Sequence, residues 1–246
     1  MRADYNYRLF YDCVKFNFLT MMEFKFKKVT GEDELTEVFK LRYKVYCEEW
    51  GFEKTGEHIG RVEFDEFDKH SVHFAAEERD TNILIGTVRI ILNSEKGFPI
   101  EKHSKIDADL SHIDRNKIGE ISRLAISKEY RRRVEDRFTF DAVTGYSSGV
   151  PKVSFERRRR QEIVIGLYKC IYIESKRIGL THCYAIMGQG LFLLLQRMGI
   201  VFNSIGPEID YHGVRRPYVG HIEEMERTLF KENPTLFKEF TEGRNS

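Results

Sequence analysis

The sequence is poor in cysteine, and the few cysteines it has are scattered. Only four occur among 246 residues, and Cys13, Cys47, Cys170 and Cys183 form no C-x-x-C pair. Zinc sites and disulfide frameworks need cysteines at characteristic spacings, so neither is expected, and no metal site is predicted. A chain without disulfides is typical of a reducing compartment, which predicts a cytoplasmic location.

An excess of charge and a long apolar run are also missing. The chain has 40 lysines and arginines against 39 acidic residues, a formal net charge of +1. Such a balance creates no overall field that would attract nucleic acid or a membrane, so an anionic partner must meet a local basic patch. No apolar stretch reaches the roughly 18 residues that a transmembrane helix needs. Few aromatic residues lie among the arginine runs, which further disfavours a nucleic-acid-binding module.

The length and the hydrophobic content of 41% are sufficient for a sizeable core. The predicted main domain covers residues 30–225, with a mobile basic insertion at about 131–160 and a C-terminal tail or helix over 226–246. Residues 1–29 are expected to form an extension packed on this domain. The extension is rich in aromatics but lacks the apolar centre of a signal peptide, so it is expected to be a docked helix or strand. Contact with a membrane surface or a partner is the alternative.

Hydrophobic periodicity predicts an α/β fold with one mixed sheet and helices on its faces. A helix is expected from Thr30 to Trp50, with Thr30 and Asp33 as its cap. An early hairpin implies antiparallel pairing, whereas alternation of strands and helices in the second half implies parallel pairing there. The predicted strands are 71–78, 83–92, 119–127, 180–187, 200–209 and 215–222, and the later helices are 161–178 and 188–199.

Charged residues occur where the pattern predicts a buried interior. Arg42 lies within the apolar stripe of the first helix, and Arg89 lies in a strand that is otherwise apolar. A buried charge without a partner costs several kcal/mol, so these arginines need acceptors. Two interpretations stay open: a structural ion-pair network that fixes the register, or a polar site within a cleft. The other charges in such segments are Glu63, Asp65, Asp68, Glu120 and Arg123.

Taken in order, these segments resemble the acyl-homoserine-lactone synthase family, which has the GNAT acyltransferase fold. The resemblance covers roughly residues 30–220. A closer branch, associated with the exosortase (PEP-CTERM) protein-sorting system and related to N-acyl amino acid synthases, has stretches similar to "LRYKVYCEEWGFE" and "YHGVRRPY". The residues that match the family motifs are Arg42, Val45, Tyr46 and Trp50; Glu63, Asp65 and Asp68; Gly86 and Arg89; and Glu120, Ser122 and Arg123.

The resemblance implies a sheet with a splayed central strand and an enzyme that acylates an amine. Glu120 is the implied general base, and backbone N–H groups near Leu124 and Ile126 would stabilise the oxyanion. Arg123 and Arg89 would bind a substrate carboxylate or hold Glu120. In an ideal strand Glu120 and Arg123 point to opposite faces, and the sequence reveals no bulge that would bring them together. The implied substrate-binding residues are Arg42, Trp50, Asp65, Asp68, Arg89 and Ser122.

The implied donor is a fatty acyl thioester of an acyl carrier protein. Where related enzymes have a glycine-rich loop that cradles the pyrophosphate of coenzyme A, this chain has "KEYRRRVEDRF", although acyl-coenzyme A stays an alternative donor. A basic surface would suit the acidic carrier protein; a solvated loop is the alternative. The docking residues would be Arg131, Arg132, Arg133, Arg157 and Arg158.

Neither the acceptor nor the acyl chain length can be read from the sequence. The acceptor would be an amino acid or a related metabolite, and nothing selects between an amino acid and S-adenosylmethionine. The apolar stretches 163–173 and 190–202 would line an acyl tunnel or belong to the plain core. A catalytically silent binding or regulatory module with the same fold is the alternative to an enzyme.

Overall fold

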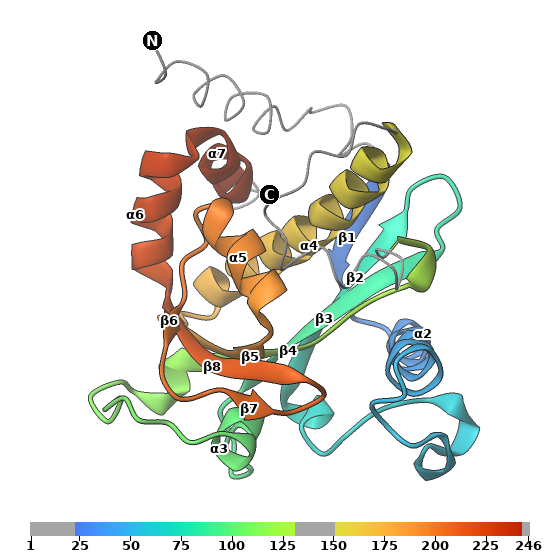
Figure 1. Ribbon diagram of the computed structural model, residues 1–246, viewed down its shortest axis with the longest axis horizontal. Coiled ribbons are helices and arrows are strands. Elements are labelled where there is room, and N and C mark those ends of the chain that lie inside the picture. Colours follow the sequence, from blue (N-terminus) through green and yellow to red (C-terminus); the bar gives the residue numbers. More distant parts are fainter. Residues whose placement is uncertain (1–22, 131–150, 243–246) are drawn as a thin grey trace.

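The computed structural model describes residues 23–130 and 151–242, without the side chains of residues 151–158. A single mixed sheet runs through the molecule in the order β1-β2-β3-β4-β5-β8-β6, and β7 pairs with β8 (Figure 1). The strands are β1 (Phe24–Lys28), β2 (Ser71–Glu78), β3 (Leu84–Leu92), β4 (Ile118–Ile126), β5 (His182–Met187), β6 (Asn203–Ser204), β7 (Ile209–Asp210) and β8 (Val214–His221).

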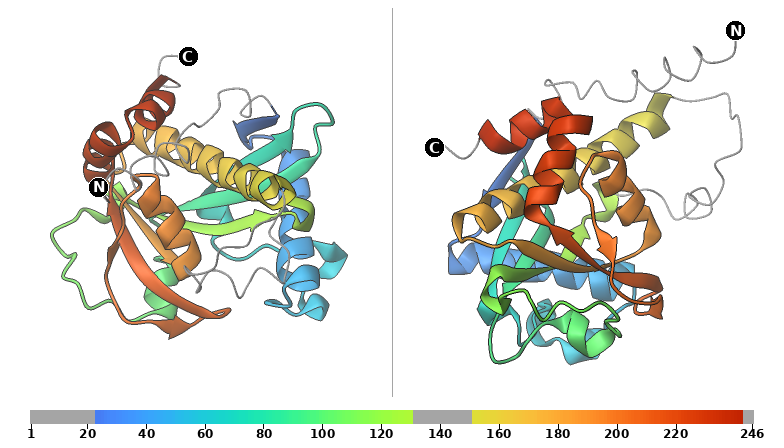
Figure 2. Two further views of the ribbon diagram at one scale, coloured as in Figure 1. Left: turned by 45° about the horizontal axis from the view of Figure 1, so that its top comes forward. Right: turned by 90° about the vertical axis from the view of Figure 1, so that its left-hand side faces the viewer.

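Helices cover both faces of the sheet, as expected. The long helix α4 lies across β1, β2 and β3, and the main core lies between it and the sheet (Figure 2). On the other face, α2 packs against β3 and β4, and α3 packs against β5. The helices are α2 (Glu32–Tyr43), α3 (Pro99–His103), α4 (Pro151–Arg177), α5 (Gln189–Arg197), α6 (Ile222–Glu232) and α7 (Pro234–Glu242).

The predicted pairing of the strands is correct in the first half and only partly correct in the second. β2, β3 and β4 pair antiparallel in sequence order, and β4 pairs parallel with β5. The strand β8, however, is antiparallel to β5. The expected strand over 200–209 is instead two short strands, β6 and β7, which lie beside β8. Turning back through these short strands reverses the direction of the chain, which alternation alone does not reveal.

The two halves of the sheet part beside the middle of β4. Pairing between β4 and β5 runs from Ile118, opposite His182, to Ile121, opposite Ala185, and then stops. From Ser122 to Ile126, β4 pairs only with β3 among the described strands. The central strand is therefore splayed, as the resemblance implied.

The first helix differs in detail from its prediction. It begins at Glu32 after Gly31, whose position has no side-chain cap, so the predicted caps Thr30 and Asp33 are wrong. The last predicted turns form a wider π-helix, Lys44–Glu49. Arg42 is nevertheless buried among apolar residues, as its place in the sequence predicted.

The segment boundaries also shift. Helix α4 begins at Pro151, well before the predicted start at Gln161, so the end of the predicted basic insertion is helical. Strand β1, placed in the N-terminal extension by the sequence, pairs with β2 at the edge of the sheet. Residues 226–242 continue through α6 and α7. The rest of the insertion and residues 1–22 lie outside the described residues.

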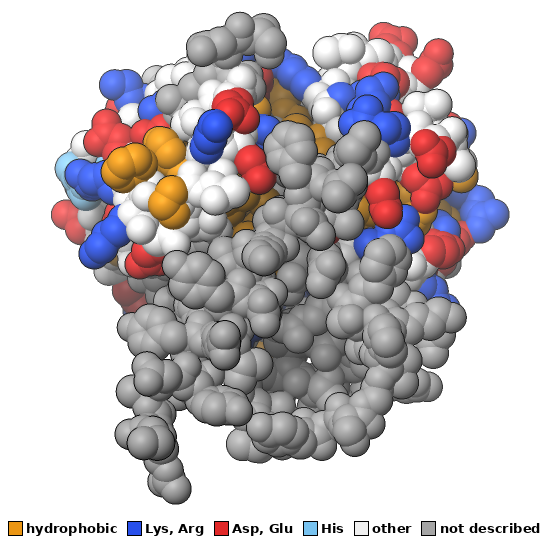
Figure 3. Space-filling view, turned by 90° about the horizontal axis from the view of Figure 1, so that it is seen from above, with side chains coloured by type: hydrophobic (Ala, Val, Ile, Leu, Met, Phe, Trp, Pro, Cys, Tyr) orange, Lys and Arg blue, Asp and Glu red, His pale blue; other side chains and the backbone are white. Residues whose placement is uncertain are grey.

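The described surface shows acidic and basic side chains interspersed, with apolar side chains visible between them (Figure 3). Within residues 23–130 and 151–242, none of the helices combines the length and the apolar character needed to cross a membrane.

Candidate active site

A β-bulge in β4 decides where Arg123 points. Arg89 of β3 lies opposite Ser122, but Thr87 lies opposite Ala125, so β4 has one residue more than β3 in this interval. The backbone of Arg123 is left-handed, with a φ of 54°. Such a conformation is uncommon for a residue with a side chain, and surrounding contacts must hold it. The bulge lets Arg123, Ser122 and Glu120 line one cavity, which an ideal strand would prevent.

Arg42 is bound by two carboxylates in the interior. Its Nε donates to Glu63 Oε2 at 2.5 Å, and its two terminal nitrogens donate to the oxygens of Asp68 at 2.6 and 3.2 Å. The side chain is only 1% exposed. All of its nitrogens are engaged within the chain, which places Arg42 in the scaffold rather than against a substrate.

Arg89 is held in the same way from the next strand. Its two terminal nitrogens each donate to one oxygen of Asp65 at 2.7 Å, and Nη1 also donates to Asp68 Oδ1 at 2.6 Å. Its Nε donates to Ser122 Oγ at 2.9 Å. The predicted convergence of these segments is thus present. The charges form an ion-pair network, and several of its members also line a cavity.

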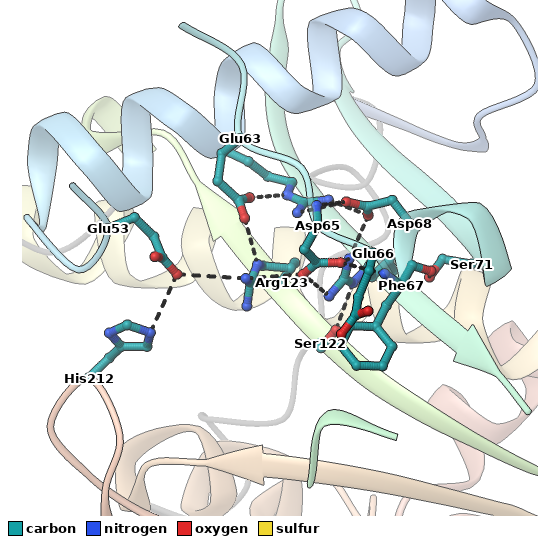
Figure 4. Close-up of polar contacts among 12 residues, drawn as sticks. Glu53, Glu63, Asp65, Glu66, Phe67, Asp68, Ser71, Ser122, Arg123 and His212 are labelled. Carbon is teal, nitrogen blue, oxygen red and sulfur yellow. Dashed lines mark hydrogen bonds and ion pairs between the residues drawn. The ribbon is translucent and has the colours of Figure 1, made fainter. Parts of the chain in front are cut away.

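Arg123 completes the network from the bulge. Its Nε donates to Glu63 Oε1 at 3.1 Å, and its Nη2 lies 3.2 Å from Asp65 and 3.7 Å from Glu53 (Figure 4). The guanidinium also lies over the ring of Tyr46, 5.6 Å from its centroid. Three arginines and four carboxylates are thereby joined across the helix, the following loop and the sheet.

The arginines keep the buried carboxylates ionised. Burial acts to raise the pKa of Asp65, but the hydrogen bonds and the charge of Arg89 outweigh it, so the pKa is lowered. Burial also acts to raise the pKa of Asp68 and of Glu63. The charge of Arg42 opposes this effect at both carboxyl groups, and both pKa values are lowered. The network is therefore charged at neutral pH.

Glu120 differs from these carboxylates. It is 2% exposed, and burial raises its pKa to about 8. Its Oε2 accepts the backbone N–H of Ile100 at 2.9 Å. Among the described residues no donor reaches Oε1. A carboxyl group that titrates near neutral pH and retains a free oxygen can exchange a proton with a bound ligand.

Sequence reasoning missed His73, which lies on β2 opposite Arg89. It is 5% exposed and its Nε2 lies 3.6 Å from Asp68. Burial, opposed by Asp68, lowers its pKa to about 4, so the imidazole is neutral and fills space beside the network. Its place on the inner face of a predicted strand was the only available signal.

Two cavities meet at the parting of the sheet. One, of about 690 Å³, is mainly apolar and extends from β4 and β5 to residues of α4 and α5. The other, of about 370 Å³, has many charged side chains in its lining, among them Glu53, Asp65, Arg89, Glu120 and Arg123. We call them the apolar cavity and the polar cavity. The residues that line both are Tyr46, Ile121, Ser122, Arg123, Ile186, His212 and Arg215.

Besides Ser122 and Arg123, three predicted site residues line the apolar cavity alone: Trp50, Leu124 and Ile126. The Leu124 carbonyl accepts a hydrogen bond from the hydroxyl of Tyr46 at 3.1 Å. Trp50 stacks on Phe52, with ring centroids 5.5 Å apart. Asp68 and Arg42 lie behind the cavities, in the network, and line neither of them.

The loop between β7 and β8 contributes residues that sequence reasoning assigned no role. His212 stacks on Phe52 at 4.9 Å, Tyr211 contacts His212 at 4.6 Å, and His103 stacks on Tyr211 at 4.5 Å. These rings bridge from the segment after α2 to α3. Glu53, His212 and Arg215 lie in the stretches that carry the resemblance, which was the signal that could have found them.

The predicted carrier-protein surface cannot be placed. Arg131, Arg132 and Arg133 lie outside the described residues, and the side chains of Arg157 and Arg158 are not described. Their role stays a prediction. Among the side chains that the structure describes, no group of three or more histidine, cysteine or acidic residues could hold a metal ion.

Comparison with known proteins identifies the architecture. A model of the acetyltransferase (GNAT) domain family matches residues 41–139, the segment that contains the end of α2 and the strands β2, β3 and β4. The bulge in β4 lies within this matched segment. The fold is that of the GNAT acyltransferases. No protein of curated function matches the sequence.

The solved structures that share this fold include several synthases of acylated small molecules. FeeM, an N-acyl amino acid synthase from uncultured soil microbes, is 12% identical with a TM-score of 0.54, covering 87% of this chain and 98% of its own. LasI, an acyl-homoserine-lactone synthase, is 16% identical with a TM-score of 0.54 over 85% and 94%. BjaI, a coenzyme A-dependent acyl-homoserine-lactone synthase, is 15% identical with a TM-score of 0.55 over 82% of each chain.

Proposed function

We propose that this protein is an N-acyltransferase that moves a fatty acyl chain from a thioester to the amine of an amino acid or related metabolite. One observation carries the proposal: an apolar cavity and a polar cavity share their lining at the bulge in β4. An apolar chain and a polar amine need different surroundings, and the reacting atoms must meet where the two adjoin. The resemblance of the fold to synthases of this kind supports the same reaction.

The first step is removal of a proton from the acceptor ammonium. We assign it to Glu120, directly or through a water, because its carboxyl group lies in the polar cavity and its pKa is raised to about 8 by burial. A base with a pKa near the working pH is both available and strong enough to take the proton. The network around Arg89 and Arg123 fixes the strand that carries it.

The free amine then attacks the thioester carbonyl. A bond forms between the amine nitrogen and the carbonyl carbon, and the carbonyl oxygen becomes negative. When this tetrahedral intermediate collapses, the carbon–sulfur bond breaks, and the thiolate leaves and takes up a proton. Backbone N–H groups of β4 near Leu124 and Ile126, at the parting of the sheet, are our candidates for stabilising the oxyanion. The acyl chain would lie among the side chains of α4 and α5 in the apolar cavity.

An acyl carrier protein is the donor that we favour. After β4 the sequence "KEYRRRVEDRF" contains no glycine, and backbone cradles for a pyrophosphate depend on glycine. The alternative donor is acyl-coenzyme A, since the structurally similar synthase BjaI is coenzyme A-dependent. An association with the exosortase system stays a prediction from the resemblance.

A direct test incubates the purified full chain with palmitoyl-acyl carrier protein or palmitoyl-coenzyme A and a mixture of the twenty amino acids and S-adenosylmethionine. Mass spectrometry should detect one or a few N-palmitoyl products, formed faster from the carrier protein. Equal rates would contradict the donor assignment alone. Absence of any acylated product with both donors would contradict the enzyme and support the silent binding module.

A further inference from the structure

Three arginines line the polar cavity, and carboxylates of the chain already neutralise the charge of two of them. Arg89 is surrounded by Asp65, Asp68 and Ser122, and Arg123 is bound by Glu63 and Asp65. Groups bound in this way gain little from an additional anion. They therefore position the site rather than recognise a ligand.

Arg215 of β8 is different. It lines both cavities, and its guanidinium lies over the ring of Phe52, 5.8 Å from the centroid. Among the side chains that the structure describes, no carboxylate lies within ion-pair distance of it. Its neighbour Arg216, in contrast, pairs with Glu208 at 3.1 Å and lines neither cavity. Arg215 is thus a cation in a partly enclosed site that no anion among the described side chains balances.

Glu53 is the complementary case among the carboxylates. It lines the polar cavity, and its ion-pair contacts are long: 3.7 Å to Arg123 Nη2 and 3.6 Å to His212 Nε2. The His212 contact counts as an ion pair only when the imidazole is protonated, and burial lowers the pKa of His212. Glu53 therefore has more negative charge than its neighbours balance.

These two residues lie close to the same aromatic group. His212 contacts Glu53, stacks on Phe52 at 4.9 Å, and is affected electrostatically by Arg215. An anion and a cation, each incompletely balanced among the described side chains, therefore lie beside one stacked pair of rings. Glu53, His212 and Arg215 line the polar cavity, and Phe52 lines the adjoining apolar cavity. Opposite charges in the lining of one cavity match a ligand that carries both signs.

We propose that Arg215 and Glu53 form the receptor for the α-amino acid group of the acceptor, with the carboxylate on Arg215 and the ammonium on Glu53. This inference rests on the proposed function, because it names the class of acceptor for the same site. A guanidinium binds a carboxylate through two parallel hydrogen bonds, which also orients it. An amine without an adjacent carboxylate would lack this anchor.

A free amino acid and S-adenosylmethionine both carry this group, so the test includes both. Titration calorimetry on the full chain measures binding of each of the twenty L-amino acids and of S-adenosylmethionine. The best ligand is then compared with its α-amide and with its decarboxylated amine. We expect the wild-type protein to bind the acid about ten- to a hundredfold more tightly than either derivative, the scale of one charged hydrogen-bonding contact.

Two variants and two matched controls locate the effect. Arg215→Gln should bind acid and amide with equal, weak affinity, and Glu53→Gln should weaken every ligand that keeps the ammonium. Arg216→Gln removes the same charge from the neighbouring position, and Glu57→Gln removes an acid that pairs with Lys54 on the surface. Both controls should keep the wild-type affinities, and circular dichroism confirms that each variant is folded.

The proposal is overturned if acid and amide bind the wild-type protein equally, if no α-amino acid binds, or if Arg215→Gln changes nothing. A separate titration with 4′-phosphopantetheine covers the donor: the proposal is also overturned if Arg215→Gln weakens only that binding, because the arginine would then recognise the phosphate of the donor. Amino-acid binding is measured without any donor. Acid-selective binding that depends on Arg215 without acyl transfer would contradict the enzyme alone, and acyl transfer to amines without a carboxylate preference would contradict the receptor alone.

Discussion

The Nε atom of Arg123 lies 3.1 Å from Oε1 of Glu63, although the two residues are 60 positions apart in the sequence. The other oxygen of Glu63 accepts from Arg42 at 2.5 Å. One carboxylate therefore connects helix α2, the loop after it and the bulge of β4. Since Arg123 adopts an unfavourable left-handed backbone, this contact helps to keep the bulge formed.

Replacing Glu120 by glutamine tests its role as the base. Glutamine keeps the shape of the side chain but cannot take a proton, so kcat for acyl transfer should fall by about a hundredfold or more. The control is Glu101→Gln, which removes a carboxylate that pairs with Arg115 outside both cavities. Steady-state rates of the two folded variants provide the measurement, and wild-type turnover in Glu120→Gln would exclude Glu120 from the mechanism.

The pH dependence of the reaction follows from the same residue. Glu120 acts as a base only when ionised, and burial raises its pKa to about 8. The rate should therefore rise with pH and level off above about pH 8. A profile of kcat/KM from pH 6 to pH 10 measures this limb. A rate that is flat across this interval in the wild-type protein would show that the titration of another group, or none, controls the reaction.

Stability should depend on pH in the opposite sense at this site. The folded protein holds the Glu120 proton up to about pH 8, whereas the usual value is 4.5, so the folded state binds more protons between these limits. The free energy of unfolding contributed by Glu120 is therefore lost as the pH rises through this interval. Glu120→Gln has no such loss. Urea denaturation of both proteins measures the free energy of unfolding at pH 5 and at pH 9. From pH 5 to pH 9 the variant should become more stable relative to the wild-type protein, and an unchanged difference in stability would contradict the raised pKa.

Arg42→Ala should destabilise the protein strongly. The change leaves Glu63 and Asp68 buried without their main cation, and removing one partner of a buried ion pair costs about 3 to 5 kcal/mol. Lys40→Ala is a control on the same helix, because its ion pair with Glu37 is exposed and should contribute less than about 1 kcal/mol. Denaturant midpoints compare the two variants. A similar small loss in both would mean that the network does not hold the fold.

Leu194→Trp should shorten the acyl chain that the enzyme accepts. Leu194 of α5 lines the apolar cavity, and a larger side chain there reduces the room for the far end of the chain. Misfit of one or two methylenes costs roughly ten- to a hundredfold in kcat/KM, so long donors should suffer and short ones should not. Phe230→Trp, at an exposed site on α6, is the control. A uniform loss for all chain lengths would place the acyl chain elsewhere.

Much of this arrangement could be predicted from the sequence because it depends on patterns that the sequence displays. Arg42 stands in an apolar stripe and Arg89 in an apolar strand, and both are buried and paired as expected. The strands β2, β3 and β4 follow from alternation and turn residues. The resemblance added the splay of β4 from β5, which no local pattern reveals.

Other features depend on long-range contacts that no local rule contains. Side chains of a regular strand alternate between the two faces of the sheet, so a sequence pattern assigns each residue to a face. The extra residue of the bulge at Arg123 interrupts this alternation. The helical pattern predicted a start at Gln161, after the arginines at 157–160, yet α4 begins earlier, at Pro151. Arg215 and Glu53 lie in stretches that carry the resemblance, but the sequence does not show that their charges are incompletely balanced among the described side chains.

The short seam between β4 and β5 has a consequence for heat resistance. Only four residue pairs join the two half-sheets there, from Ile118 to Ile121. An acyl chain bound in the gap would pack against both half-sheets and add apolar contacts between them. A non-hydrolysable donor analogue should therefore raise the melting temperature, and more so the longer its acyl chain, because hydrocarbon contacts would then join the half-sheets where strand pairing stops.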